Sequence, residues 1–283
     1  MTFTMRKALI VYCSPAGSTG HVARVIQRTL VDLKIPVEIV DLARDGELDM
    51  ILPQLLDARD NLCLFIGSPV YASHAVPPVM EFIARLPEAA CGCAVPFVTY
   101  GTVTSGTALH DMACALSERG YTVIGAAKVM ARHSMMWTAD VALGQDRPDE
   151  ADDQKIKEMV TSLEGRLAQT DPEAVPLADL DYQSDPHRSW MKKISLAGAR
   201  DHFPVRRVDE ERCNQCGLCV ELCPSGAVSL DPYPRFGRQC FFCFNCVRLC
   251  PQEAIRADLA PLLGRIRALK AKVGEPEETR TWT

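Results

Sequence analysis

Eight cysteines fall into two short runs whose spacing suits iron–sulfur chemistry. Their positions are Cys213, Cys216, Cys219 and Cys223 in the first run, and Cys240, Cys243, Cys246 and Cys250 in the second. Each run reads C-x2-C-x2-C-x3-C-P, in which three closely spaced thiolates can wrap one face of a cubane while a fourth arrives from elsewhere. Two such runs predict two [4Fe-4S] clusters.

The runs resemble those of bacterial two-cluster ferredoxins, in which the last cysteine of each run ligates the other cluster. This resemblance implies two crossed ligand sets. Cluster I takes Cys213, Cys216, Cys219 and Cys250, and cluster II takes Cys240, Cys243, Cys246 and Cys223.

The two runs are copies of one unit, because each cysteine lies 27 residues from its counterpart, as from 213 to 240. Zinc sites close with four ligands, typically in two separated pairs, and do not explain a third and fourth cysteine followed by proline in both copies. Disulfide frameworks suit secreted chains. The register of the two copies therefore favours iron–sulfur clusters over zinc or disulfides.

The composition is that of an ordinary globular protein, with 47% hydrophobic and 24% charged residues, and the 283 residues leave room for two domains. A net charge of -5 argues against nucleic-acid binding. No stretch approaches the roughly 18–20 apolar residues of a membrane span. The N-terminus reads as a first strand and not as a signal peptide, so we expect a cytoplasmic protein.

Five cysteines lie outside the runs: Cys13, Cys63, Cys91, Cys93 and Cys114. Cys91 and Cys93 could form a vicinal redox pair or be two loop thiols. A chain so rich in thiols favours a reducing, anaerobic cytoplasm.

Strands and helices alternate from Lys7 to about Ala168. The expected strands span 8–12, 37–42, 62–67, 95–100 and 122–130, and the expected helices follow at about 22–30, 48–56, 77–86, 106–119 and 152–167. Apolar strands alternating with helices predict an α/β fold with a doubly wound, five-stranded parallel sheet.

Ligands of such sheets bind beyond the carboxyl ends of the strands, where three loops stand out. The first contains Ser14, Ala16, Gly17, Ser18 and Thr19, the second Ser68, Pro69, Val70 and Tyr71, and the third Tyr100, Gly101, Thr102, Ser105 and Gly106. Hydroxyls and a small-residue turn at a helix N-terminus suit a phosphate, although a plain helix cap reads the same way. The absence of a lysine after Gly17 excludes a P-loop.

The first loop resembles the S-x-T-G-[NS]-T phosphate loop of the flavodoxin family, with Ala16 in place of the usual threonine. The resemblance covers residues 5 to 168. It implies bound FMN, with the phosphate on the first loop and the isoalloxazine ring between the other two. Tyr71 and Tyr100 are candidates to stack on the ring, or are core aromatics. His133 and Trp137 are further candidates at the flavin edge, or belong to a plain loop.

The rest of the chain separates into three parts. A proline-rich linker spans 171–204 and divides the FMN domain, 1–170, from a small α+β ferredoxin-like domain, 205–258. We expect a short docking helix at 190–194. The segment 259–283 follows, with a packing helix at 260–273 and a loose polar end.

Together the two units resemble the flavodoxin–ferredoxin fusion proteins of anaerobic bacteria and archaea over nearly the whole chain. The resemblance implies an electron-transfer protein that passes low-potential electrons between FMN, the clusters and redox partner proteins. The alternative is an FMN-dependent reductase that acts directly on a small acceptor such as a quinone. No GxGxxG fingerprint is present, so a built-in NAD(P)H domain is not expected. A homodimer is left open.

The two runs differ in their intervening residues. Phe241, Phe242 and Phe244 lie within the second run, whereas Asn214 and Gln215 occupy two of the corresponding places in the first. Phenylalanines exclude water and remove polar neighbours, which predicts a lower potential for cluster II. The alternative is that these rings are ordinary packing.

Overall fold

The computed structural model describes residues 7–43, 62–89, 92–169, 171–273 and 275–283. The helix predicted at 48–56 and the thiol of Cys91 lie outside these residues. None of the described helices is long and apolar enough to cross a membrane.

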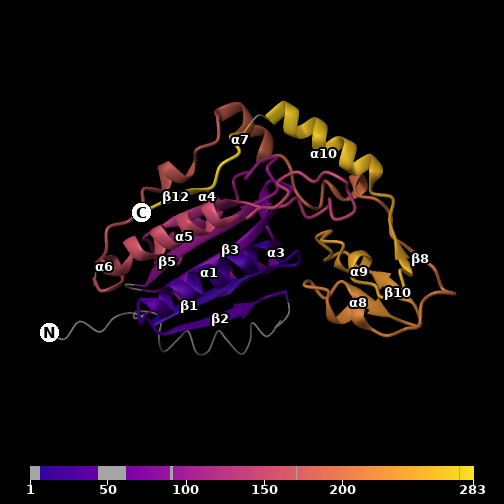
Figure 1. The fold of residues 1–283 in the computed structure, drawn as a ribbon, viewed down its shortest axis with the longest axis horizontal. Coiled ribbons are helices and arrows are strands. Elements are labelled where there is room, and N and C mark those ends of the chain that lie inside the picture. Colours follow the sequence, from indigo (N-terminus) through magenta and orange to yellow (C-terminus); the bar gives the residue numbers. More distant parts are fainter. Residues whose placement is uncertain (1–6, 44–61, 90–91, 170, 274) are drawn as a thin grey trace.

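A central sheet organises the N-terminal part of the chain (Figure 1). Its strands run in the order β2-β1-β3-β5-β7-β12, and the first five are parallel. The parallel strands are β1 (Lys7–Tyr12), β2 (Val37–Asp41), β3 (Leu62–Tyr71), β5 (Cys93–Tyr100) and β7 (Ala126–Met130). The doubly wound, five-stranded parallel sheet is confirmed, with the 2-1-3-4-5 strand order of flavodoxin-like folds.

Helices cover both faces of this sheet. Leu9 and Val11 of β1 belong to the core beneath α3 (Pro77–Arg85) and α4 (Ala108–Glu118). Ala8 and Ile10 belong to the core beneath α1 (Ser18–Asp32) and α5 (Glu150–Ser162), which α6 (Glu164–Leu167) follows. Successive side chains of a strand point to opposite faces, so a sheet buried on both faces requires uninterrupted apolar strands.

Two strands differ from their expected limits. The predicted strand 122–130 divides into β6 (Thr122–Val123) and β7, and both pair with β5. β3 continues to Tyr71 and pairs there with the short antiparallel β4 (His74–Ala75). The turn between β3 and β4 holds Ala72 and Ser73 at positive φ. Tyr71 is consequently a strand-end residue at the edge where ligands bind.

The C-terminal end is ordered, so the expectation of a loose tail was wrong. β12 (Arg280–Trp282) pairs antiparallel with β7 and covers what would otherwise be an open sheet edge. Trp282 is buried and stacks on Tyr182 with ring centroids 5.4 Å apart. The pairing with β7 and the burial of Trp282 therefore stabilise an ordered conformation of this segment, although its composition is polar.

Glu275 anchors the same tail. Its carboxylate accepts hydrogen bonds from Thr104 Oγ1 and Ser105 N, both at 2.8 Å, and lies 3.2 Å from Lys128 Nζ. The side chains of Lys128 and Glu275 are 3% and 5% exposed. Burial acts to raise the pKa of Glu275, but Ser105, Lys128 and its other partners hold that pKa below its ordinary value.

The cysteine runs form a separate small unit of short elements (Figure 1). Two antiparallel strand pairs repeat in it: β8 (Arg207–Val208) with β11 (Ile255–Arg256), and β9 (Val228–Leu230) with β10 (Pro234–Phe236). One short helix lies in each run, α8 (Leu218–Glu221) and α9 (Asn245–Arg248). This repeat is what an internal duplication predicts.

The segment 171–204 lies against the sheet unit and holds three short helices. They are η2 (Leu177–Leu180), α7 (Asp185–Met191) and η3 (Arg200–His202). The docking helix expected at 190–194 is instead α7, which begins earlier, with Pro186 in its first turn, and ends at Met191. His74 Nε2 donates to the carbonyl oxygens of Met191 and Ile194, at 3.2 and 2.8 Å. The helix α10 (Ala260–Val273) then leads back from the cysteine unit to the tail.

Candidate functional site

The first loop lies between β1 and α1, and its shape depends on one glycine and one carboxylate. Gly17 precedes α1 with φ 96°, a conformation that favours glycine. Asp41 Oδ1 accepts from Ser14 N at 3.2 Å, and Ser14 Oγ accepts from Gly20 N at 2.8 Å. Thr19 Oγ1 is 2.8 Å from Thr99 Oγ1, which links the loop to the end of β5. The loop is thereby fixed at the carboxyl edge of the sheet.

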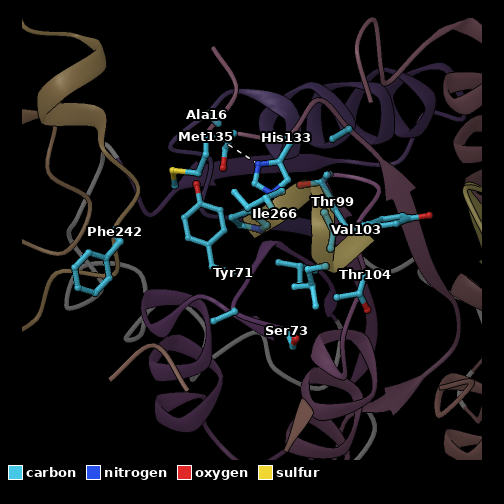
Figure 2. A pocket seen from close by; sticks show the side chains of 18 of the residues that line it. Ala16, Tyr71, Ser73, Thr99, Val103, Thr104, His133, Met135, Phe242 and Ile266 are labelled. Atoms are coloured by element: carbon cyan, nitrogen blue, oxygen red, sulfur yellow. Dashed lines mark hydrogen bonds between the residues drawn. The ribbon is translucent and has the colours of Figure 1, made fainter. Parts of the chain in front are cut away.

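A cavity of about 260 Å³ lies at this edge (Figure 2). Eight of the predicted cofactor residues line it: Ala16, Ser18, Thr19, Pro69, Val70, Tyr71, Tyr100 and Gly101. The remaining wall comes partly from distant segments, with Phe203, Phe242 and Ile266 among its members. We call this space the large cavity because more residues line it than line the neighbouring spaces, although the open cavity beside it has a larger volume. Its lining is mainly apolar and aromatic, as a planar ring system requires.

A second, more open cavity adjoins the large one around the N-terminus of α1. The two share Ala16, Ser18 and the segment Arg132–Ser134. The second cavity is further lined by Gly17, His21, Arg24, Trp137, Asp146, Arg147, Pro148 and Arg248, so that its arginines outnumber its one carboxylate. We call it the arginine cavity. Cationic side chains and the N-terminus of a 15-residue helix both favour a bound anion.

The residues present fit FMN. The apolar large cavity suits an isoalloxazine ring, and the arginine cavity beside the first loop suits a phosphate. Trp137, predicted as one of two flavin-edge candidates, lines the arginine cavity. His133 lines both spaces.

His133 holds a defined hydrogen bond at the cavity wall. Its Nδ1 accepts from Met135 N at 3.3 Å, drawn as the dashed line in Figure 2. One part of the ring faces the cavity, so the side chain is half-buried, and burial lowers the pKa of His133 to about 4. The imidazole is therefore neutral near pH 7, and because Nδ1 accepts, Nε2 carries the proton.

Five predicted cofactor residues line neither cavity: Ser14, Ser68, Thr102, Ser105 and Gly106. Ser68 Oγ donates to Pro69 O and accepts from Val76 N, so it shapes the second loop. Ser105 bonds the tail through Glu275. Gly106 has φ 62°, and a Cβ there would lie 1.9 Å from Ser73 O, so the close approach of these two loops requires glycine.

Sequence reasoning missed two groups of cavity residues. One belongs to the sheet unit, lies beside the predicted loop residues and includes Ser73, Thr99, Val103 and Thr104, and the other comes from outside that unit. Leu262, Ile266 and Leu269 of α10 line the large cavity. Their i, i+4, i+7 spacing indicated one apolar helix face, but not what that face covers. Phe203 lies in the segment expected to be a linker, and its ring stacks on Phe242 with centroids 4.2 Å apart. No local pattern marked Phe203.

The cysteines gather in two places. Cys213, Cys216 and Cys219 line one small cavity together with Cys250 of the other run, and we call this place site I. Cys216 is exposed, and the other three are partly buried. The crossed set of ligands implied for cluster I is thus brought together around one space.

The remaining four cysteines, Cys223, Cys240, Cys243 and Cys246, form site II. Their mutual proximity is evident in Cys243, whose pKa is raised to about 12 by burial and by Cys246, Cys223 and Cys240. Cys240 and Cys246 are buried. Ala227 N donates to Cys223 Sγ at 3.2 Å, and the duplicated Ala254 N donates to Cys250 Sγ at 3.3 Å. The last cysteine of each run is therefore held in the same way.

Among the described residues, no group of three or more His, Cys, Asp or Glu side chains is arranged to hold a single metal ion. A cubane distributes its four thiolates over four irons, so its ligands need not converge on one point. The thiol-only donor sets of sites I and II fit such a cluster.

Site II, and not site I, adjoins the large cavity. Phe241 belongs to the same hydrophobic core as Tyr71 and Cys13, and Cys243 packs against that core. The rings of Tyr71 and Phe241 lie 5.9 Å apart. Burial and the Cys243 thiol both raise the pKa of Tyr71. Figure 2 shows Phe242 entering from the second run opposite the loops of the sheet.

Arg248 of α9 makes a direct link between the two units. Its guanidinium donates to Pro15 O of the first loop and to Asn245 Oδ1. It also lies 6.0 Å from the Trp137 ring centroid. The residue 27 positions earlier is Glu221, so this contact belongs to the second run alone.

One comparison with known proteins matches the region of the first cysteine run. Residues 206–229 match the family model of a 4Fe-4S binding domain. The comparison with curated proteins found no match.

Three solved structures illustrate the likeness of the other part. Rubredoxin oxygen:oxidoreductase from Desulfovibrio gigas is 20% identical with a TM-score of 0.47, covering 58% of this chain and 36% of that one. An archaeal flavodoxin is 20% identical with a TM-score of 0.43, covering 58% of this chain and 99% of that one. Megasphaera elsdenii flavodoxin is 23% identical with a TM-score of 0.40, covering 57% of this chain and 98% of that one. The chain therefore spans about a third of the oxidoreductase but nearly all of each flavodoxin.

The strand order, rather than these scores, assigns the fold. The chain joins a flavodoxin-like α/β unit to a ferredoxin-type region that contains a 4Fe-4S binding domain. This organisation agrees with the resemblance to flavodoxin–ferredoxin fusions in the sequence motifs.

Proposed function

We propose that the protein is an electron carrier that holds FMN in the two adjoining cavities and [4Fe-4S] clusters at sites I and II. It passes low-potential electrons to a redox partner protein. When bound, FMN exchanges one or two electrons and a cubane one at a time, so the combination links both kinds of chemistry.

One observation carries this proposal: site II packs against the wall of the large cavity. Phe241, Tyr71 and Cys13 share one hydrophobic core, with Cys243 packed against it. Cys219 of site I is in turn close enough to Cys246 of site II for that thiol to contribute, after burial, to its raised pKa. Site I, site II and the large cavity therefore follow one another, and the exposed Cys216 marks the end that a partner can approach.

The protein's own residues would position FMN and keep water from its ring. Ser18 lines both cavities, where the phosphate end would meet the ring end, and Thr19 and Tyr71 line the ring end. Leu262 and Ile266 of α10 cover the same space. A covered ring favours transfer through site II over direct reaction with a small acceptor.

The experiment is an anaerobic preparation of the full chain assayed for flavin, iron and acid-labile sulfide. We expect one FMN and eight irons per chain, from two four-iron cubanes. A colourless, zinc-loaded protein would contradict the proposal. Sustained reduction of a quinone with only a chemical reductant present would instead support an FMN-dependent reductase, whereas strict dependence on a protein acceptor supports the carrier.

A further inference from the structure

Arg206 lies outside both cysteine runs but contacts two thiols of site II. Its Nη1 donates to Cys240 Sγ at 3.3 Å and lies 3.8 Å from Cys246 Sγ. Within the described part of the chain, these two sulfurs are the polar atoms to which its guanidinium donates. The side chain precedes β8 and is only partly exposed. A permanent positive charge is thus held directly beside site II.

Aromatic rings fix the guanidinium in this place. Its Cζ lies 4.0 Å from the Phe236 ring centroid, 5.8 Å from that of Phe244 and 5.9 Å from that of Phe242. Planar guanidinium groups stack on aromatic faces, and the lysine ammonium does not share this geometry. Phe242 and Phe244, two of the rings expected to exclude water from site II, therefore also help Phe236 to position a cation there.

The internal duplication identifies the corresponding residue at site I. Val208 of β8 pairs with Ile255, and Phe236 of β10 pairs with Val228. Val228 and Ile255 lie 27 residues apart and are counterparts in the repeat, so Val208 and Phe236 are counterparts as well. Arg206 lies two residues before Val208, and Pro234 lies two residues before Phe236. Pro234 lines the site I cavity. Site I thus has a residue without charge or donor where site II has a guanidinium.

We propose that Arg206 tunes the redox potential of cluster II and holds it more positive than the surrounding phenylalanines alone would. The proposal rests on the proposed function, because it requires a [4Fe-4S] cluster at site II. Reduction transfers one electron from the reductant to the cluster and adds one negative charge to it. A neighbouring cation and its N–H···S hydrogen bonds stabilise that added charge. Arg206 therefore raises the potential of cluster II, whereas the phenylalanine rings are predicted to lower it.

The test uses full-length holoprotein carrying Arg206→Met, which keeps an unbranched side chain but removes the charge and the donors. Potentials are measured by anaerobic titration with dithionite, followed by electron paramagnetic resonance. We expect one-electron reduction of cluster II to become at least roughly tenfold less favourable, a shift of about 59 mV to more negative potential. Cluster I should not shift. Arg207→Met, the loss of an exposed charge one residue away, is the matched control and should leave both potentials unchanged.

Three results would overturn the role of Arg206. They are an unchanged cluster II potential in Arg206→Met with eight irons, an equal shift of both clusters, and an equal shift in Arg207→Met. If Arg206→Met fails to retain iron at site II, Arg206→Gln, which keeps an amide donor, provides the same test and must also shift cluster II alone. A wild-type protein without a second cluster signal would refute the proposed function and the tuning with it, whereas an unshifted cluster II signal in Arg206→Met refutes the tuning alone.

Discussion

At the residue scale, His133 has the most clearly defined protonation state in the candidate site. Its pKa is lowered to about 4 by burial, from the ordinary value of 6.5. We expect nuclear magnetic resonance of the imidazole to show the neutral Nε2–H form down to about pH 5. A titration midpoint near 6.5 would contradict this.

The same lowered pKa has a consequence for stability. Between pH 6.5 and 4 the unfolded chain protonates His133 and the folded chain does not, so the unfolded state binds more protons. The free energy of unfolding therefore falls as pH falls through this window. His133→Gln should flatten that part of the curve in urea unfolding measured at several pH values.

Arg248 allows the contributions of the phosphate and of the ring to FMN binding to be measured separately. Arg248→Gln removes a cation from the arginine cavity. Hydrogen bonds to charged groups contribute about 1.5–3 kcal/mol, so we expect the Kd for FMN to rise roughly tenfold or more. Riboflavin, which has no phosphate, should bind as it does to the wild type. Quenching of flavin fluorescence measures both.

Arg212→Gln is the matched control for this experiment. Arg212 is an exposed arginine of the same unit that pairs with Asp209. Equal weakening of FMN and riboflavin in Arg248→Gln would mean that Arg248 acts through the shape of the Pro15 loop and not through the phosphate.

Sequence reasoning reached the sheet loops of the cavity but not its opposite wall. Ser18, Thr19 and Tyr71 were predictable because all parallel strands deliver their carboxyl-end loops to one edge. Phe203 and Ile266 were not, because their positions depend on how segments far apart in the chain pack together. Phe242 was noticed only as a neighbour of cysteines.

At the scale of elements, the tail segment is held by a buried ion pair. Glu275→Ala leaves Lys128, whose side chain is 3% exposed, with Glu278 Oε1 at 3.7 Å as its remaining carboxylate. Removing one partner of a buried pair costs about 3–5 kcal/mol, and Glu278 offsets part of that. We expect a loss of about 3 kcal/mol in the free energy of unfolding, measured by urea denaturation.

Glu277→Ala provides the comparison within the same segment. Glu277 pairs with Lys270, but its side chain is 50% exposed. Exposed pairs contribute about 0–1 kcal/mol, so this variant should be nearly as stable as the wild type. Similar losses in the two variants would show that the tail, and not the buried charge, accounts for the effect.

The ordered tail was the main element that the sequence did not predict. Its residues are polar, and a three-residue strand has no recognisable period of its own. Only the open edge of β7 gives it a partner, and that edge becomes apparent once the strand order is known. The central strands, by contrast, were predictable because burial on both faces requires continuous apolar runs.

At the scale of the whole molecule, the two cysteine sites face different surroundings. Cys216 of site I is exposed, whereas Cys240 and Cys246 of site II are buried. We expect an iron chelator or brief oxidation to remove cluster I first, so that iron is lost in two phases with an intermediate of about four irons. Iron assays with paramagnetic resonance at each time point measure this. Simultaneous loss of both signals would contradict it.

The proximity of site II to the large cavity could not be read from the chain. Cysteine spacing defines how each cluster is held, but not which cluster turns toward the sheet unit. Two differences between the copies correspond to this orientation. Arg248 stands where the first run has Glu221, and Phe241 and Phe242 stand where it has Asn214 and Gln215.

The pairing of β12 with β7 makes the cysteine unit an insertion rather than an appendage. The chain leaves the sheet after β7 and α5, builds both cysteine sites, and returns through α10 to the same sheet. A module attached at both ends has less freedom to move than a module attached at one point. The separation between site II and the large cavity is therefore constrained by two connections to the same sheet, one through the segment after α5 and the other through α10.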